Sequence, residues 1–216
     1  MVVPPGRAGQ APAGRTFIET ARRNQIVAAA IDTIAEVGYG RASLARIAAQ
    51  AGISPGLISY HFAGKNDLID QVIRDVQAEG LAYMQPRIRA ETTGPGMVRA
   101  YIESNLAFIR DHRNHMAAIL DIARNAVTPD GQRRFHRDGE ATRAERLLTE
   151  LLAKFQAAGE LRADFDPKVM AVTIGAAITA IPPRLVADPN LDVDSYAAEI
   201  ATTFDLATRL VQAHHD

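Results

Sequence analysis

A glycine turn between two short amphipathic segments, within residues 43–62, limits the possible folds of this chain more than any other feature. The apolar residues of the first segment recur at the i, i+3, i+4, i+7 spacing of a helix with one buried face, at Leu44, Ile47, Ala48 and Ala51. Gly52 follows directly, where a chain leaving a helix commonly adopts a positive φ that a residue without Cβ tolerates. The pattern predicts a helix that begins after the N-cap Ser43 and ends before Gly52.

A second helix is predicted to begin at Pro55, with Ser54 as its N-cap. Proline suits the first helical position because its φ is preset and it has no amide hydrogen to leave unpaired. The apolar side chains expected to face inward are Leu57, Ile58 and Phe62. The outer face then carries groups that suit phosphates and base edges, namely Gly56, Ser59, Tyr60 and His61. Two helices joined in this way form a helix-turn-helix, which indicates binding to DNA.

The charge of the chain is divided unevenly along its length. Residues 1–65 carry seven Lys and Arg against three Asp and Glu, a net charge of +4, whereas the remainder carries 17 against 22. This asymmetry favours contact between the N-terminal segment and phosphate, although four charges could also belong to an ordinary solvated surface. Three arginines are expected to help with phosphates: Arg22, Arg23 and Arg41.

Composition narrows the class of protein. The 216 residues are 47% hydrophobic, enough for a substantial core in one or two domains. The absence of cysteine excludes disulfides and thiol catalysis and suits a reducing compartment. Residues 1–14 lack the apolar core of a signal peptide, and the uncharged run 169–183 is shorter than the roughly 20 residues of a membrane span. We expect a cytoplasmic protein without membrane contact, in which 169–183 forms a buried helix.

Helical periodicity along the chain, without runs of alternating β-branched residues, predicts an all-α protein of about nine helices. A flexible arm, residues 1–15, is expected to precede a helix that opens with a capping box at Thr16 and ends at Gly38. These observations assign residues 16–64 to a three-helix DNA-binding domain. A linking helix from Lys65 towards Met84 should then lead into a larger helical domain, residues 65–216, with Pro86 kinking or ending that helix.

Further helices are expected in the larger domain, over 97–111, 113–127, about 128–158, 168–181 and from Asp192 or Asp194 onward. The third of these is inferred from a stripe of apolar residues that includes Leu148, Leu152 and Phe155. Gly159 is expected to end it, and Asp166-Pro167 to start the next helix.

With the helix-turn-helix placed, residues 26–73 resemble the DNA-binding domain of TetR-family transcriptional regulators. The matching positions are Ala30, Gly38-Tyr39, Ser43, Ile47-Ala48, Ala51-Gly52-Ile53-Ser54, Gly56, Tyr60-His61-Phe62, Lys65 and Leu68. The resemblance implies a homodimer, usually a repressor, whose larger domain binds a small molecule and thereby moves two DNA-reading heads out of register. It therefore assigns residues 65–216 to ligand binding and dimerisation, and it implies an operator in double-stranded DNA as the partner.

The resemblance implies a set of DNA-binding residues: Arg41, Ser43, Ser54, Pro55, Gly56, Ser59, Tyr60, His61 and Lys65. Ser59 departs from the family, which commonly has a tyrosine three residues after the motif glycine. A short hydroxyl thus replaces a phenol that often reaches a backbone phosphate. Ser43 and Ser54 could instead act only as helix caps, and His61 could pack beside Phe62.

A candidate ligand site lies along one face of the helix predicted over 97–111. Its side chains follow i, i+4, i+7, i+11: Tyr101, Asn105, Phe108 and His112. An amide and an imidazole on a partly apolar stripe suit a pocket between helices, although satisfied core polar groups would give the same pattern. Residues on later helices complete the predicted ligand-binding set: Met116, Leu120, Arg124, Phe155 and Thr173.

Small residues near the C-terminus would allow close helix packing, namely Gly175, Ala176, Thr179 and Ala180. The resemblance implies that the last helices build the dimer interface, and a small stripe facing the core of one subunit is the alternative.

Metal binding and catalysis have weaker support in the sequence than DNA binding. His112-x-x-His115 has the spacing of metal ligands on a helix, with His136 and Asp111 as conceivable additions. Without cysteine or a second spaced pair, we expect no metal site and no cofactor. The alternative function is a helical-bundle enzyme that uses Asp121, His112 or His136 as acid or base. No carboxylate pair, nucleophile with its base or phosphate-binding loop stands at a convincing spacing.

Overall fold

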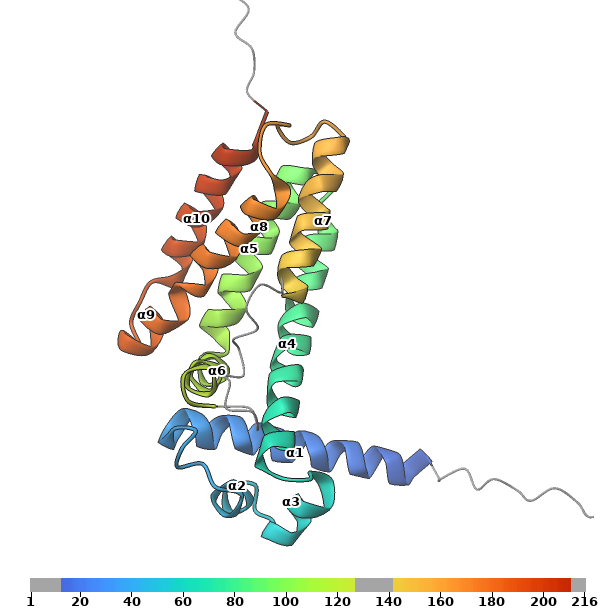
Figure 1. Ribbon diagram of the computed structural model, residues 1–216, viewed down its shortest axis with the longest axis vertical. Helices are drawn as coiled ribbons and strands as arrows, with labels where there is room; N and C mark the ends of the chain where they lie inside the picture. The colour runs from blue at the N-terminus through green and yellow to red at the C-terminus, as the bar shows by residue number, and fades with distance from the viewer. Residues whose placement is uncertain (1–12, 127–141, 211–216) are drawn as a thin grey trace, which may run out of the picture. The chain divides into compact units, whose positions relative to one another are not determined.

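The structure is a computed structural model that describes residues 13–126 and 142–210. Within these ranges the chain forms ten α-helices and no strand, so the all-α class is confirmed (Figure 1). In chain order they are α1 (Ala13–Val37), α2 (Leu44–Gln50), α3 (Pro55–His61), α4 (Lys65–Ala90), α5 (Gly94–Asp111), α6 (Arg113–Asn125), α7 (Arg143–Ala157), α8 (Pro167–Thr179), α9 (Ile181–Ala187) and α10 (Val193–Thr208). The chain divides into two compact units, residues 1–72 and 73–216.

The first unit opens with α1, which begins earlier than expected. Of the expected arm, residues 1–12 lie outside the described part of the chain, whereas Ala13–Arg15 are already helical. Thr16 therefore lies inside α1, and its prediction as the residue that opens a capping box is wrong. The predicted end of the helix is confirmed, because Gly38 has a φ of 82° and follows the last helical residue, Val37.

The helix-turn-helix forms as predicted, with one difference at its second cap. The Ser43 hydroxyl accepts a hydrogen bond from the Arg46 amide at 3.2 Å, which caps α2, and Gly52 takes the turn at a φ of 65°. Ser54 occupies the N-cap position of α3, but its side chain makes no capping hydrogen bond. Residues of all four helices bury their side chains in this unit: Ile26, Ala30, Ile34, Ile47, Ala48, Ile58, Phe62, Leu68, Ile69 and Val72. Leu57, expected inside, is only half-buried.

The helix α4 passes from the first unit into the second, because the boundary after Val72 falls within it. Its first two turns contribute Leu68, Ile69 and Val72 to the core of the first unit. Pro86 lies inside α4, which continues to Ala90, so the proline does not end the helix.

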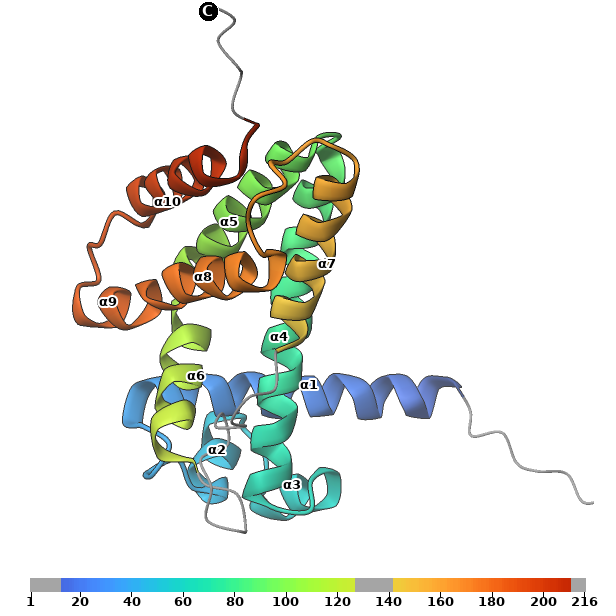
Figure 2. The same ribbon diagram turned by 45° about the horizontal axis from the view of Figure 1, so that its top comes forward.

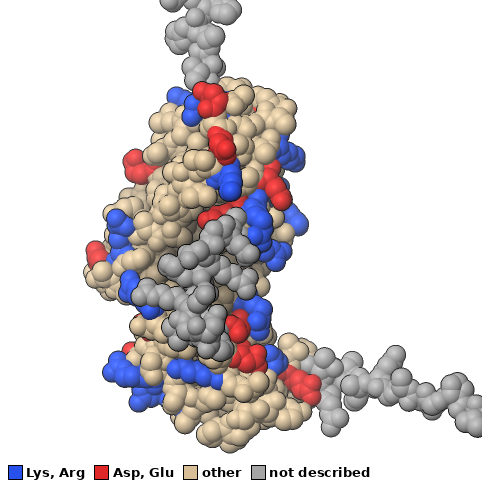
Figure 3. All heavy atoms as spheres, in the orientation of Figure 1, with Lys and Arg blue, Asp and Glu red and all other residues tan. Residues whose placement is uncertain are grey.

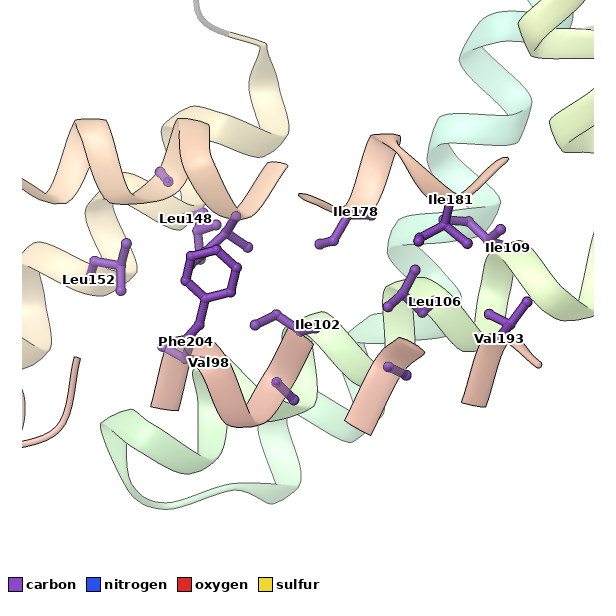
Figure 4. Close-up of a cluster of buried hydrophobic side chains, with 14 of the residues drawn as sticks. Val98, Ile102, Leu106, Ile109, Leu148, Leu152, Ile178, Ile181, Val193 and Phe204 are labelled. Carbon is purple, nitrogen blue, oxygen red and sulfur yellow. The ribbon is translucent and has the colours of Figure 1, made fainter. Parts of the chain in front are cut away.

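The second unit is a bundle whose core is drawn from five helices, α5, α7, α8, α9 and α10. Figures 1 and 2 show α5 beside α10 and α7 beside α8, which are the most extensively packed pairs in this unit. Their facing side chains form one buried apolar cluster (Figure 4), which includes Val98, Ile102, Leu106, Ile109, Leu148, Leu152, Phe155, Ile174, Ile178, Val193 and Phe204. The heptad-like spacing of these residues on α5 explains why this helix lies at the centre of the unit.

Two boundaries in this unit differ from the prediction. The helix predicted over about 128–158 is not continuous. Thr142 is the N-cap of α7, where it has an extended backbone conformation and forms a capping box with Glu145. Residues 127–141, where the predicted helix begins, lie outside the described part of the chain. The helix expected over 168–181 ends at Thr179, and the Pro182-Pro183 segment forms the separate α9, which raises the number of helices above the expected nine.

The apolar stretch Pro167–Ala187 covers α8 and α9. Its length of 21 residues and mean hydropathy of 1.6 would allow it to cross a membrane, a test that core helices of soluble proteins also pass. The prediction that residues 169–183 form a buried helix is met only in part. Ala171, Ile174 and Ile178 are buried, whereas Val169 and Val172 on the same helix are exposed. The helix α8 therefore has a second apolar face.

Candidate nucleic-acid interface

The helix α3 and its cap present an uncovered surface in the first unit. The predicted DNA-binding residues of this segment that are exposed are Ser54, Pro55, Gly56, Ser59 and Tyr60. The Tyr60 side chain is 72% exposed, and its ring meets that of the half-buried His61 edge to face at 5.0 Å. The buried Ile58 and Phe62 hold the opposite side of α3 against the core. An aromatic and a hydroxyl that face solvent from a short, anchored helix can reach into a groove of DNA.

Two further predicted residues lie on either side of α2. Ser43 is exposed, and its hydroxyl caps the helix, so capping accounts for at least part of its role. Arg41 is exposed and donates a hydrogen bond from Nε to the Val37 carbonyl at 2.7 Å. On the face drawn in Figure 3, Lys and Arg side chains gather over the α1 and α2 part of this unit, and the part where Figure 1 places α3 carries little charge.

Lys65 is held within the unit. Its Nζ donates a hydrogen bond to the Tyr39 carbonyl at 2.5 Å and lies 4.1 Å from the centre of the Tyr39 ring. Partial burial lowers the pKa of Lys65. These contacts tie the first residue of α4 to the turn after α1, a relation that the sequence analysis did not find. Contact between Lys65 and a phosphate stays a prediction.

Of the two α1 arginines expected to contact phosphates, Arg23 differs from the expectation. Arg23 turns its guanidinium into the unit, where Nη1 donates to the His61 carbonyl at 2.5 Å and the group lies 4.3 Å from the centre of the Phe62 ring. Arg22 donates from Nη1 to Oε1 of Gln25 at 2.6 Å. The placement of Arg23 argues against the phosphate contact predicted for it.

In the second unit, the predicted ligand-binding residues of α5 lie in two different clusters of side chains. Tyr101 packs against the central apolar cluster, as do Met116 and Phe155 of the predicted set. Burial raises the pKa of Tyr101, and a hydrogen bond with Asn105 acts in the opposite direction. Glu145 of α7 is also close enough to act on the Tyr101 hydroxyl.

Phe108 and His112 belong to a different, aromatic cluster, which includes α4. Their rings stack with centres 4.1 Å apart, and the Tyr83 ring lies 5.5 Å from Phe108. A Cβ on Gly80 would lie 3.2 Å from the Phe108 ring, so this glycine allows the close approach of α4 and α5. Sequence reasoning missed Gly80 and Tyr83, although their i, i+3 spacing places them on one face of α4.

Three members of the predicted ligand set lie apart from these clusters. Leu120 is half-buried on α6, and Arg124 on the same helix is exposed. Thr173 is exposed on α8, where its hydroxyl donates to the Val169 carbonyl at 2.8 Å. The structure does not bring Arg124 and Thr173 together with the buried members of the set.

The two histidines with metal-ligand spacing meet a carboxylate of α4. Nε2 of His112 lies 3.6 Å from Glu79 Oε1, and Nε2 of His115 lies 3.2 Å from Glu79 Oε2. Asp111 is engaged elsewhere, with Tyr83 and Arg110, and His136 lies outside the described residues. Within residues 13–126 and 142–210, no group of three or more His, Asp or Glu is arranged to hold a metal ion.

Residues 26–72 match the family described as bacterial regulatory proteins, tetR family. The chain is also similar to the HTH-type transcriptional regulator BetI of Cronobacter sakazakii, with 31% identity over 137 residues, which cover 62% of this chain and 66% of that protein. It is 36% identical over 85 residues to BetI 1 of Chromohalobacter salexigens, covering 39% of this chain and 42% of that protein. The matches span less than two thirds of the length of either relative.

A solved structure resembles the fold of most of the chain. The transcriptional regulator FadR from Bacillus subtilis, in complex with stearoyl-CoA, superposes with a TM-score of 0.69 at 19% identity, over 83% of this chain and 95% of that one. The matched family is one of regulators rather than enzymes, so the alternative of a helical-bundle enzyme has no support in it. The helix-turn-helix geometry and these matches together show that the chain belongs to the tetR family of DNA-binding transcriptional regulators.

Proposed function

We propose that the protein is a homodimeric, cytoplasmic repressor that binds a palindromic operator and is released from it by a small-molecule effector. The observation that carries the DNA-binding half of this proposal is the uncovered face of α3, where Tyr60 is exposed beside Ser59 and Gly56 while Ile58 and Phe62 anchor the opposite face. In a dimer, two such helices would occupy successive major grooves about 34–36 Å apart.

The proposed contacts to DNA follow from this placement. Tyr60 and His61 would meet base edges or phosphates from the end of α3. A Cβ on Gly56 would meet nothing within 4 Å in the free protein, so packing within the chain does not require a glycine there. Gly56 would instead let the backbone approach the duplex. Ser59 donates to the Pro55 carbonyl at 3.5 Å, a long contact that a phosphate could replace. Arg41, Ser43, Ser54, Pro55 and Lys65 complete the proposed set.

Dimerisation through the C-terminal helices has support in exposed apolar side chains on α8 and α10. On α8, Val172 is 47% exposed and the small residues Ala176 and Thr179 also face solvent. On α10, Leu206 is 54% exposed, and Tyr196, ten residues earlier, is 39% exposed. The exposure of Ala176 and Thr179 favours packing against a second subunit, whereas Gly175 and Ala180 of the same stripe are half-buried. Apolar faces of this kind are typical of a surface that a second subunit covers.

The effector site is proposed between α5 and α7, around Tyr101, Asn105 and Phe155. A half-buried tyrosine beside an amide provides donors and acceptors next to apolar walls, which is the composition of small-molecule sites. Control by a small molecule agrees with the stearoyl-CoA bound to FadR from Bacillus subtilis.

The proposal is tested by binding of the full chain to a duplex that it selects from a random pool. Tyr60→Ala should lower the affinity for that duplex by roughly tenfold to a hundredfold, as loss of a base-edge contact costs about 1–3 kcal/mol. Phe17→Ala is a matched control, because Phe17 is an exposed aromatic of the same unit (76% exposed) outside the proposed set. Equal affinities of the natural chain and Tyr60→Ala would overturn the proposed interface.

A further inference from the structure

The helix α1 donates side-chain hydrogen bonds to the C-terminal ends of both helices of the helix-turn-helix. Nε2 of Gln25 donates to the carbonyl of Ala51, the C-cap of α2, at 2.7 Å. Nη1 of Arg23 donates to the carbonyl of His61, the last residue of α3, at 2.5 Å. The last carbonyls of a helix have no partner within the helix, so each of these bonds satisfies a group that would otherwise need water.

Further contacts fix the two donors in these positions. The Arg23 guanidinium lies 4.3 Å from the centre of the Phe62 ring, which is 2% exposed, and its Nη2 is 3.5 Å from Oε1 of Gln71 on α4. Arg22 donates to Oε1 of Gln25 at 2.6 Å, which leaves the Gln25 amide nitrogen to face Ala51. A planar guanidinium can stack on a ring and donate at its edge at the same time, and a lysine cannot reproduce both contacts.

We propose that Arg23 and Gln25 are positioning residues that set the orientation of α3 relative to α2, and thereby the register in which the outer face of α3 meets DNA. The inference rests on the proposed function. Its central point is that Arg23 holds the backbone of His61, which is adjacent to Tyr60. A displaced end of α3 would carry both side chains away from the positions at which they read a sequence.

Positioning and phosphate contact by Arg23 have different consequences. A phosphate contact contributes to the affinity for every duplex, and its removal lowers the slope of log affinity against log salt by about 0.9. A positioning residue acts on sequence reading, so its removal lowers the affinity for the selected duplex more than that for other duplexes and leaves the salt slope unchanged. The ratio of the two affinities and the salt slope together therefore separate the two roles.

The experiment compares the full natural chain with Arg23→Met on a duplex selected from a random pool by the natural chain, and on a shuffled duplex of the same composition. Between 50 and 200 mM salt, Arg23→Met should lower the ratio of selected to shuffled affinity by about tenfold, the effect of one mismatched base pair, with no change in slope. An equal loss on both duplexes with a slope reduced by about one, or an unchanged ratio, would overturn the inference.

Additional variants keep the result decisive if Arg23→Met does not fold. Arg23→Lys retains the charge and a donor, and it should restore part of the ratio. Gln25→Met should lower the ratio by a smaller factor without any change of slope, and an unchanged ratio in this variant would also count against the inference.

Arg99→Met is the matched control, because Arg99 is an arginine of the second unit paired with Glu103 at 3.1 Å. If the natural chain selects no duplex at all, the proposed function itself fails; if it does and the variants match it, only this inference fails.

Discussion

The hydroxyl of Tyr83 donates a 2.6 Å hydrogen bond to Oδ2 of Asp111, which joins α4 to the C-terminal end of α5. Arg110 donates from Nε to the other oxygen of Asp111 at 2.8 Å and also binds Asp194 of α10. Hydrogen bonds from Arg110 and Tyr83 lower the pKa of Asp111, and the bond to Asp111 raises the pKa of Tyr83. Arg110 and Asp111 at the end of α5 thus link three helices of the second unit, since Asp111 binds Tyr83 of α4 and Arg110 binds Asp194 of α10.

This carboxylate predicts a pH dependence of stability. Because the pKa of Asp111 is lowered in the folded chain, its contribution is present above the ordinary aspartate value of about 4 and is lost as the pH falls through the lower folded value. Chemical unfolding should therefore show Asp111→Asn less stable than the natural chain at pH 7, with the difference shrinking below about pH 4. A difference that is constant from pH 7 to pH 3 would contradict this assignment.

Removal of the Tyr83 hydroxyl tests the same junction from the side of α4. Tyr83→Phe keeps the ring against Phe108 and deletes only the hydrogen bond, so its cost should be at most about 1 kcal/mol at this exposed position. Denaturant unfolding at pH 7 measures the cost. In the Asp111→Asn background the same substitution should cost less, and full additivity of the two changes would show that the bond does not form.

Gly94 predicts a steric effect at the start of α5. A Cβ at this position would lie 2.7 Å from Cγ of Phe155, a buried ring, while the Gly94 amide donates to Oε2 of Glu160 at 2.6 Å. Gly94→Ala should destabilise the chain by about 1–3 kcal/mol, because the ring must shift in a packed core. Gly40→Ala is the control, since a Cβ there meets nothing within 4 Å. Equal thermal midpoints for the two variants would show that Phe155 moves away at no cost.

The exposed Leu206 of α10 predicts the effect of a charge on assembly. Leu206→Asp should convert a dimer into a monomer in sedimentation velocity, because an unpaired carboxylate would be buried in the proposed interface. Leu147→Asp on α7 introduces the same charge at a leucine of similar exposure (44%) and should leave the dimer intact. Dissociation by both variants, or by neither, would contradict the proposed interface.

The helix-turn-helix was predictable because its signals are local. Ser43 caps α2 through an amide three residues away, and Gly52 takes a positive φ that few other residues tolerate. Ser54 shows the limit of such signals, since it occupies the predicted cap position without making the capping bond. The role of Arg23 was not predictable, because its partner His61 lies 38 residues along the chain and a surface arginine has the same sequence pattern.

The candidate ligand site was predicted less well for the same physical reason. A helical stripe fixes which residues share a face of α5, but not which neighbouring helix covers each turn. Tyr101 meets the central cluster, whereas Phe108, two turns later, packs on Gly80 of α4. The exposure of Thr173 likewise depends on the second apolar face of α8, which periodicity alone cannot distinguish from a buried one.

The central claim, sequence-specific operator binding by a dimer, is tested most directly by sequencing the duplexes that the full chain enriches from a random pool. We predict a palindromic consensus whose half-site centres lie one helical turn, about 10–10.5 base pairs, or a multiple of it apart. A pool that shows no enrichment over the input, or a consensus without two-fold symmetry, would contradict it.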